Sequence, residues 1–266
     1  MTDYAQGDYY DKNGRLLLAK GQLMTNSVKH KLESLEAFCL DESLNDESGG
    51  AIAPLDIEEI GRRINLRNYK LLEYPSQILS KILFECRTAP WWLFVGALSH
   101  YLSWLYPHSI DVALISMLMA AERKPSQSSL QELGLGALLH DVGKLLIPRT
   151  LIEKTDGLTE EEEAIVRRHC ELGASVVRQY ALPAGCHDIL LQHHERLDGS
   201  GYPQGLSEDQ ICANAKIVMI ADTFDAITSY QRSQQDAEIG TVLSQLVRND
   251  AEFSQEYVSL LVQIFE

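Results

Sequence analysis

The succession of helical segments from Pro54 onward constrains the fold of this chain more than any other feature of the sequence. Dense leucines lead to a stop at Gly143, and Thr159 with Glu162 forms a capping box that opens a further helix. Pro183 starts another helix, which carries two adjacent histidines. No second strand-rich region is evident, so this part of the chain is predicted to be an all-α helical bundle. Helices are expected over residues 130–141, 159–170, 213–229, 237–247 and 254–265.

The residues before Pro54 differ from this pattern and predict a small N-terminal module. Residues 8–23 are expected to form two strands joined at Asn13-Gly14, a dipeptide that favours the positive φ angles of a tight hairpin. Residues 25–40 are expected to be helical. The acidic, Ser/Gly-rich stretch 41–50 is typical of a linker. We therefore expect two domains, a β-hairpin and helix module with its linker over residues 1–53 and a helical domain over residues 54–266.

Composition excludes several classes of protein. The five cysteines lie far apart with no CxxC pair, so we expect neither disulfides nor a thiolate zinc site, and a cytoplasmic location fits best. The N-terminal residues lack the basic-then-apolar order of an export signal. The apolar run 91–106 is shorter than the roughly 20 residues that span a bilayer, which favours a buried core helix over membrane insertion. A net charge of −15 disfavours a nucleic-acid polymer as partner, whereas a small phosphate ligand could bind where metal ions supply positive charge.

Histidines and aspartates lie on several different helices of the predicted bundle. Each signal alone is ambiguous, because a histidine or aspartate near a helix end is commonly a cap or a solvated surface group. Asp222 is more informative, since an unpaired carboxylate within an apolar helix is costly. Their joint occurrence favours a metal site built from inward-facing imidazoles and carboxylates. Such ligands without thiolate suit iron, manganese or zinc. The residues concerned are His140, Asp141, His169, His193, His194 and Asp222.

Four sequence motifs, HDVGK, RRHCELG, HHERLDGSGYP and IADTFDAITS, resemble those of the HD-GYP family. This family is a branch of the HD phosphohydrolases that hydrolyse cyclic di-GMP, and the resemblance covers about residues 100–230. It implies a helical HD-domain fold and a metal-dependent phosphodiesterase that yields the linear dinucleotide and further GMP. It also implies a metal centre of iron or manganese, and a GGDEF-domain partner that contacts the GYP loop.

Carried over by motif, the resemblance makes the six residues above metal ligands and adds His108, which we choose over His100; His100 is expected in the core. Asp141 would bridge two ions, and these ions would convert a water between them into the hydroxide nucleophile. Members of the family with three metals carry a glutamate one turn before the first histidine, where this chain has Trp104. A binuclear centre is therefore expected. One ion would be held by His108, His140 and Asp222, and the other by His169, His193 and His194.

The predicted substrate contacts are Lys144, Arg196, Asp225 and Arg232. Lys144 would point its ammonium at the scissile phosphate, although a helix-end charge is an alternative. Arg196 could instead pair with a neighbouring carboxylate, and Asp225 could serve only to stabilise its helix. Family members usually carry an Arg-Pro-Tyr-Arg/Lys run after the ITS segment, and here Arg232 is the single cation in residues 230–235.

This departure leaves two alternatives to a cyclic di-GMP phosphodiesterase. One is a phosphohydrolase for another nucleotide, and the other is a non-catalytic, metal-loaded sensor that signals through the N-terminal module. A homodimer is also compatible with the sequence.

Overall fold

The structure, a computed structural model, divides into two compact units. The first comprises residues 1–53 and 144–166, and the second, which we call the helical unit, comprises residues 54–143 and 167–266. The division falls after Ala53, and residues 144–166 are grouped with the first unit. The prediction of two domains, 1–53 and 54–266, stays a prediction. The described residues are 55–85, 89–232 and 239–266, with 3–4, 7–10, 16–18, 23–25, 28–29, 32 and 38–41 before them.

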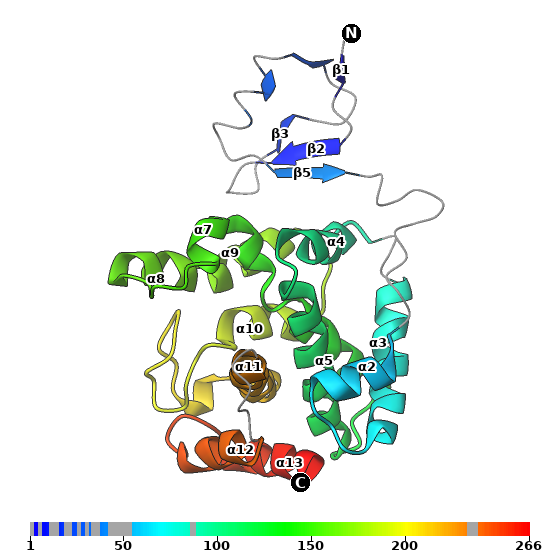
Figure 1. Ribbon diagram of the computed structural model, residues 1–266, viewed down its shortest axis with the longest axis vertical. Helices are drawn as coiled ribbons and strands as arrows, with labels where there is room; N and C mark the ends of the chain where they lie inside the picture. The colour runs from blue at the N-terminus through cyan, green and yellow to red at the C-terminus, as the bar shows by residue number, and fades with distance from the viewer. Residues whose placement is uncertain are drawn as a thin grey trace. The chain divides into compact units, whose positions relative to one another are not determined.

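Short antiparallel strands form most of the described part of residues 1–53 (Figure 1). β2 pairs with β3 and with β5, while β1 pairs with β4. The two strands β2 and β3 flank residues 11–15, so the predicted turn at Asn13-Gly14 lies outside the described residues. The strands are β1 (Asp3–Tyr4), β2 (Gly7–Tyr10), β3 (Leu16–Leu18), β4 (Leu23–Met24) and β5 (Phe38–Asp41).

The helix predicted over residues 25–40 is wrong at its C-terminal end. Val28 and Leu32 are helical and pack with Met24, as their spacing suggested. Phe38 and Cys39, however, lie in β5, where they pair with residues of β2. Pairing with a neighbouring strand satisfies the backbone polar groups of this segment, and aromatic residues suit a strand. That long-range partner is not visible in the local pattern.

The remainder of the first unit contains α7 (Arg149–Ile152) and most of α8 (Glu160–Arg167). The predicted capping box is confirmed at the start of α8. The Glu162 backbone N–H donates to Thr159 Oγ1 at 3.3 Å, and the Thr159 N–H donates to Glu162 Oε2 at 2.9 Å. These two bonds satisfy donors that the first turn of a helix leaves open.

The helical unit confirms the predicted mostly helical fold (Figure 1). Two predicted helices are each broken in two. The run 91–106 is divided where Leu102 is extended, and the helix predicted over 159–170 breaks at Arg168. The helices are α2 (Ile57–Arg63), α3 (Glu73–Glu85), α4 (Trp92–Tyr101), α5 (Leu105–Ala121), α6 (Gln127–Leu139), α9 (His169–Val177), α10 (Ala184–Gln192), α11 (Ala213–Arg232), α12 (Ile239–Arg248) and α13 (Gln255–Phe265).

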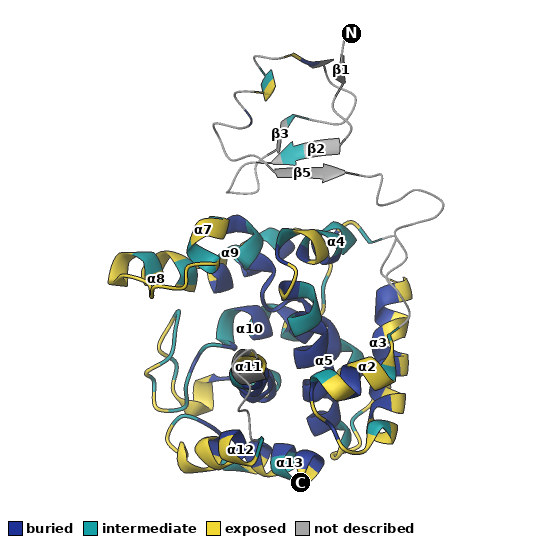
Figure 2. Ribbon diagram, in the orientation of Figure 1, coloured by how far each residue is buried: buried dark blue, intermediate teal, exposed yellow. Residues whose placement is uncertain are grey.

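Helices α5 and α11 form the centre of the helical unit, and Figure 2 shows both mainly in the buried colour. α5 packs against α3, α4, α6, α11 and α13. Leu114 of α5 and Phe224 of α11 are fully buried. Burial of such side chains supplies the main favourable term in folding. Among the described residues, no helix combines the length and apolar character needed to cross a membrane.

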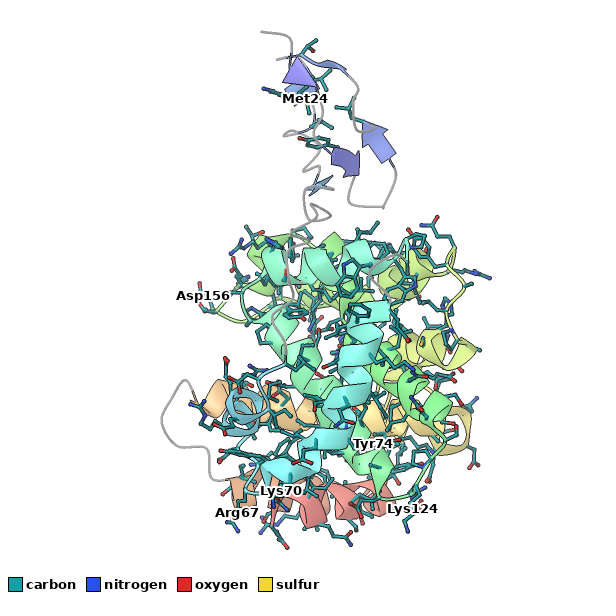
Figure 3. All side chains as sticks on the ribbon, turned by 90° about the vertical axis from the view of Figure 1, so that its right-hand side faces the viewer. Met24, Arg67, Lys70, Tyr74, Lys124 and Asp156 are labelled. Atoms are coloured by element: carbon teal, nitrogen blue, oxygen red, sulfur yellow. The ribbon has the colours of Figure 1, made fainter. Side chains whose placement is uncertain are left out.

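Figure 3 shows the described side chains, with several exposed residues labelled. Lys70, Tyr74 and Lys124, labelled there, are all exposed. Arg67 donates a hydrogen bond to the backbone carbonyl of Glu266 at 2.8 Å. The C-terminal residue is thereby held against the segment between α2 and α3.

Candidate metal centre

The side chains predicted to bind metal come from helices that pack directly on one another. Two of them cap helices, His140 at the end of α6 and His193 at the end of α10, and each is followed by a second predicted ligand. Because the chain leaves the helix there, both members of each pair can face one point. The positions are the first turn of α5 for His108, the end of α6 for His140 and Asp141, the start of α9 for His169, the end of α10 for His193 and His194, and the middle of α11 for Asp222.

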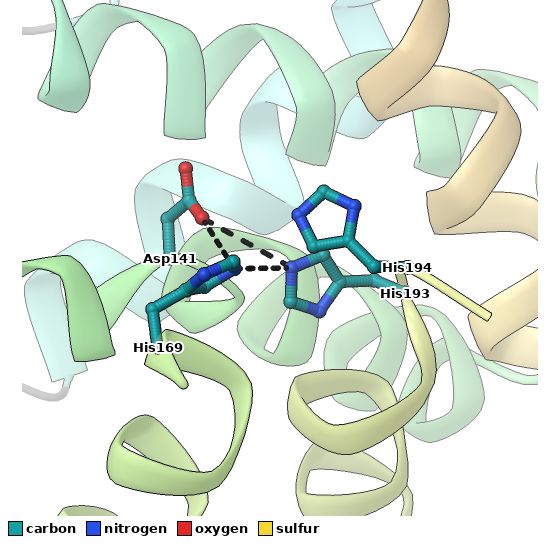
Figure 4. Close-up of side chains that lie close together, drawn as sticks. All are labelled: Asp141, His169, His193 and His194. Carbon is teal, nitrogen blue, oxygen red and sulfur yellow. Dashed lines mark hydrogen bonds and ion pairs between the residues drawn. The ribbon is translucent and has the colours of Figure 1, made fainter. Parts of the chain in front are cut away.

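One group of possible ligands consists of Asp141, His169, His193 and His194, whose ligand atoms lie within 4.8 Å of one another. Oδ1 of Asp141 is 3.5 Å from Nε2 of His169 and 4.0 Å from Nε2 of His193 (Figure 4). The two Nε2 atoms are 3.2 Å apart. Imidazole nitrogens and a carboxylate oxygen therefore converge on one buried point.

A second group, His108, His140 and Asp222, meets the same limit of 4.8 Å and lies on the other side of Asp141. Oδ2 of Asp141 is 3.6 Å from Nε2 of His108 and 3.4 Å from Nε2 of His140. Oδ1 of Asp222 is 3.2 Å from Nε2 of His108. Asp141 thus turns one oxygen to each group, which is the arrangement of a carboxylate that bridges two cations.

Backbone carbonyls orient two of these imidazoles. Nδ1 of His140 hydrogen-bonds the Ala137 carbonyl at 2.6 Å, and Nδ1 of His193 hydrogen-bonds the Ile189 carbonyl at 3.1 Å. The Nε2 atoms are then directed into the cluster as lone-pair donors. Nε2 of His140 is buried and has no hydrogen-bond partner among the described residues. Since a buried polar atom without a partner is costly, this donor set fits a metal ion.

Asp225 orients a third imidazole, which sequence reasoning missed. Its Oδ2 accepts from Nδ1 of His108 at 2.7 Å, and its side chain is only 1% exposed. Ser229, one turn further along α11, also donates to this carboxylate. The predicted substrate contact for Asp225 has no support in this geometry, because the carboxylate is buried behind His108. In the sequence, the position of Asp225 about one helical turn after Asp222 was the signal that could have indicated this role.

The pKa shifts show how strongly the cluster attracts positive charge. Burial alone would lower the pKa of His108, but hydrogen bonds with Asp222 and Asp225 raise it to about 10. Burial opposes ionisation of Asp222, yet the hydrogen bond from His108 and the nearby imidazoles hold its pKa well below the usual range. Burial lowers the pKa of His193 to about 3, with further lowering by His140. A neutral His193 has a lone pair available for a metal.

The loop after the paired histidines holds His194 in place. The buried carboxylate of Glu195 accepts backbone N–H bonds from Gln204 at 2.8 Å and Leu206 at 2.9 Å. The Tyr202 ring stacks on the His194 ring, with centroids 4.7 Å apart. The backbone N–H of Tyr202 donates to the His194 carbonyl. The resemblance identifies the GYP loop here, but the roles of Glu195 and Tyr202 depend on how the turn closes.

Two glycines allow close approaches of the backbone beside the cluster. A Cβ on Gly143 would lie 1.9 Å from the His169 carbonyl oxygen, and one on Gly201 would lie 2.4 Å from backbone atoms of Glu195. Both distances are far below van der Waals contact. Gly143 therefore allows the turn after Asp141 to pack against the start of α9, which carries His169.

The described contacts of Arg196 are with residues outside the two ligand groups. The Arg196 guanidinium lies over the Phe253 ring, its Nε is 3.6 Å from Glu252 Oε2, and its NH1 donates to the Glu195 backbone carbonyl. Arg196 thus contacts other protein groups, among them the carboxylate of Glu252. Its contact with a substrate phosphate stays a prediction. Arg232 ends α11, and its side chain lies outside the described part of the chain.

Lys144 lies in the 3-10 helix η4 (Val142–Leu146), three residues after Asp141, and belongs to the first unit. Its predicted contact with phosphate stays a prediction. His100, which we expect in the core, is in fact exposed on α4, where its Nδ1 is 2.9 Å from the Gly96 carbonyl. The buried face of α4 carries Val95 and Leu98, and His100 lies on its exposed face.

The fold and the cluster together define a helical protein with two groups of possible metal ligands at the junction of its helices. The family model described as HD domain matches residues 93–252, and the chain belongs to this family. The HD-GYP assignment made from the motifs is confirmed by the named relatives.

A protein of Pseudomonas aeruginosa named cyclic di-GMP phosphodiesterase PA4108 is 38% identical over 50% of this chain and 33% of its own length. A Thermotoga maritima protein named cyclic di-GMP phosphodiesterase is 39% identical over 46% of this chain and 34% of its own. A Vibrio cholerae protein named 3'3'-cGAMP-specific phosphodiesterase 2 is 35% identical over 47% and 24%, respectively. The chain therefore spans about a third or less of the length of these relatives.

The solved structure of Bd1817, described as a HDG"Y"P protein from Bdellovibrio bacteriovorus, is similar to this chain with a TM-score of 0.55. The match covers 98% of this chain and 95% of that one at 19% sequence identity. At that identity the likeness supports the helical HD-domain fold and nothing further.

Proposed function

We propose that this protein is a metal-dependent phosphodiesterase that hydrolyses cyclic di-GMP to the linear dinucleotide and further to GMP. The observation that carries the proposal is the pair of ligand groups around Asp141, with one carboxylate oxygen turned to each. Relatives of Pseudomonas and Thermotoga that are named for this activity support the substrate class.

The proposed centre holds two ions. Ligands without thiolate suit iron, manganese or zinc, and the family resemblance favours iron or manganese. Two cations at such a site neutralise phosphate charge and make a water nucleophilic at neutral pH. The chain itself fixes the ligands: carbonyls orient His140 and His193, and Asp225 orients His108. Lys144 remains our proposed phosphate contact. One ion would be held by His108, His140 and Asp222, the other by His169, His193 and His194, with Asp141 shared.

The test measures turnover of cyclic di-GMP by protein purified without oxygen and loaded with iron(II) or manganese(II). Asp141→Ala should abolish turnover, since it removes the oxygens that face both groups. Asp156→Ala is the matched control, because Asp156 is an exposed aspartate of the first unit (Figure 3). Absence of turnover by the metal-loaded wild-type protein, or equal activity of Asp141→Ala, would overturn the proposal.

A second candidate substrate is the cyclic dinucleotide 3'3'-cGAMP, and one specific observation favours it. Three Vibrio cholerae relatives named 3'3'-cGAMP-specific phosphodiesterases match this chain at 31–35% identity. A panel of cyclic dinucleotides under the same conditions separates the two substrates. Binding of cyclic di-GMP without cleavage would instead favour the metal-loaded sensor.

Four further proposals concern the N-terminal module, a protein partner, the oligomeric state and the location of the protein. They are a β-hairpin module over residues 1–53, a GGDEF-domain partner that contacts residues 198–203, a homodimer, and a cytoplasmic location. Co-purification and sedimentation of the intact chain test the partner and the dimer.

A further inference from the structure

The members of the cluster differ in how far water reaches them, and this difference locates its open side. The side chains of His108, His194 and Asp222 are 10%, 18% and 11% exposed. The remaining ligands are closed from solvent. A substrate phosphate must therefore approach past the three partly exposed side chains. The closed ligands are His140, Asp141, His169 and His193.

Trp104 lies at this open side. It immediately precedes α5, and its carbonyl accepts the His108 backbone N–H at 3.0 Å, so the two residues are one helical turn apart. Their rings meet edge to face with centroids 6.1 Å apart. Trp104 as a whole residue is nevertheless 44% exposed. A large aromatic surface thus faces solvent directly beside a proposed metal ligand.

The other aromatic ring beside the open side has a different environment. Tyr202 stacks on His194 and also packs under the guanidinium of Arg167, 4.9 Å from its ring centroid. Burial raises the pKa of its hydroxyl strongly. Tyr202 therefore serves to hold a ligand in place, whereas the exposed indole of Trp104 can accept a planar partner.

Nucleobases are planar partners that stack on indole irrespective of charge. This property matters in a chain with a net charge of −15 and a single cation, Arg232, in residues 230–235. With few cations to attract phosphate, recognition has to come from the bases as well as from the metal centre. A base linked to a phosphate that binds the ion proposed at His108 would lie on the side of the site where Trp104 is exposed.

We propose that Trp104 is the stacking platform for one purine base of the cyclic dinucleotide whose phosphate binds at the proposed metal centre. The inference rests on the proposed function and specifies part of its substrate site. It assigns to Trp104 a role in affinity and in the choice of base, and none in the chemistry of cleavage.

The kinetic test compares Trp104→Ala and Trp104→Phe in the full-length, metal-loaded protein. Trp104→Ala should raise KM for cyclic di-GMP about tenfold, which corresponds to the loss of one stacked base, with kcat changed less than about twofold. Trp104→Phe should restore most of the affinity, because a phenyl ring also stacks. Tyr74→Ala is the matched control, since Tyr74 is an aromatic residue of α3 that is 50% exposed. Metal content should be equal in all variants.

Two kinetic results would overturn the inference. One is an unchanged KM in Trp104→Ala, and the other is a loss in Trp104→Phe as large as in Trp104→Ala, which would indicate a packing role. Loss of metal from Trp104→Ala would also overturn it, because Trp104 would then support His108.

An equilibrium titration separates this inference from the proposed function. A non-hydrolysable phosphorothioate analogue of cyclic di-GMP should quench tryptophan fluorescence in the wild type and not in Trp104→Phe. Quenching without cleavage of cyclic di-GMP would overturn the proposed function and support the stacking site. Binding and cleavage without loss of quenching in Trp104→Phe would overturn the stacking site alone. A wild type that does not bind the analogue would overturn both.

Discussion

The carboxylate of Asp225 sets the orientation of His108, and its removal should be felt at the metal. In Asp225→Asn the amide can still accept from Nδ1, but the negative charge that makes the imidazole a stronger ligand is lost. We expect metal affinity to fall about 10- to 100-fold, as measured by competition with a chelating dye. Ser229→Ala, which removes a hydroxyl 3.3 Å from both oxygens of the same carboxylate and leaves its charge in place, is the control and should bind metal nearly as the wild type does. Wild-type affinity in Asp225→Asn would show that His108 does not depend on this contact.

A side chain at position 201 should disturb the loop that holds His194. In Gly201→Ala the new methyl group would meet the Arg196 nitrogen and the Glu195 backbone at 2.4 Å, so the loop must shift. Overpacking of this kind lowers the free energy of unfolding by about 1–3 kcal/mol, which urea denaturation measures. Activity should fall as well, because Tyr202 moves with the loop. Gly240→Ala is the control: nothing lies within 4 Å of its Cβ in α12, and the helix should gain roughly 0.5 kcal/mol. Equal stability of Gly201→Ala and the wild type would contradict the packing argument.

The sequence predicted which residues meet at the cluster better than it predicted what supports them. His140 and Asp222 belong to motifs that carry the family resemblance, and His108 was chosen over His100; the structure brings all three side chains together. Their supports could not be predicted, because each depends on a contact between distant segments. Asp225 faces His108 from another helix, and Glu195 is recognisable as a loop anchor only when residues 204–206 fold back over it.

At the scale of helices, one ion pair joins α2 to α5. Arg63 donates to both oxygens of Asp111, at 2.6 and 2.7 Å, and Asp111 is buried. Two parallel bonds of this kind are strong and geometrically specific. α2 precedes the residues matched by the HD domain family, 93–252, so this pair attaches a flanking helix to a helix of the proposed site.

Arg63→Met should leave the Asp111 carboxylate buried without its guanidinium and lower the free energy of unfolding by about 3 kcal/mol. Urea denaturation followed by circular dichroism measures the change. The double variant Arg63→Met/Asp111→Leu removes both charges and should recover most of the stability. Arg62→Met on the exposed side of α2 is the control for helix propensity. If the double variant is less stable than Arg63→Met, the unpaired carboxylate is not the cause of the loss.

Helix boundaries show where local pattern stops being sufficient. The starts of α10 after Pro183 and of α8 at its capping box were predictable, because proline and the Thr159/Glu162 pair act locally. The break at Arg168 was not, since neither glycine nor proline marks it. It occurs where the carbonyl of His169 packs against Gly143. A contact between distant segments therefore decides that α9 begins at the residue that faces the cluster.

For the whole molecule, the charge buried in the cluster links metal binding to stability. The carboxylates of Asp141, Asp222 and Asp225 lie together inside a chain of net charge −15, with the imidazolium of His108 as a partial counter-charge. Self-repulsion among such groups destabilises the compact state. Cations bound there would remove this cost, and a ligand that binds only the folded state adds to the free energy of unfolding.

Metal removal should therefore lower the melting temperature. At a free metal concentration 100 times Kd, binding contributes about 2.7 kcal/mol, which corresponds to roughly 5–10 °C for a chain of this size. Differential scanning fluorimetry of chelator-treated and manganese-loaded protein measures the shift, and added manganese should restore it. Asp141→Asn should melt at one temperature with or without metal, because the shared ligand is lost. His100→Ala, at an exposed histidine outside the cluster, should keep the full shift. Equal melting temperatures of metal-free and metal-loaded wild-type protein would mean that the cluster does not hold cations in the folded chain.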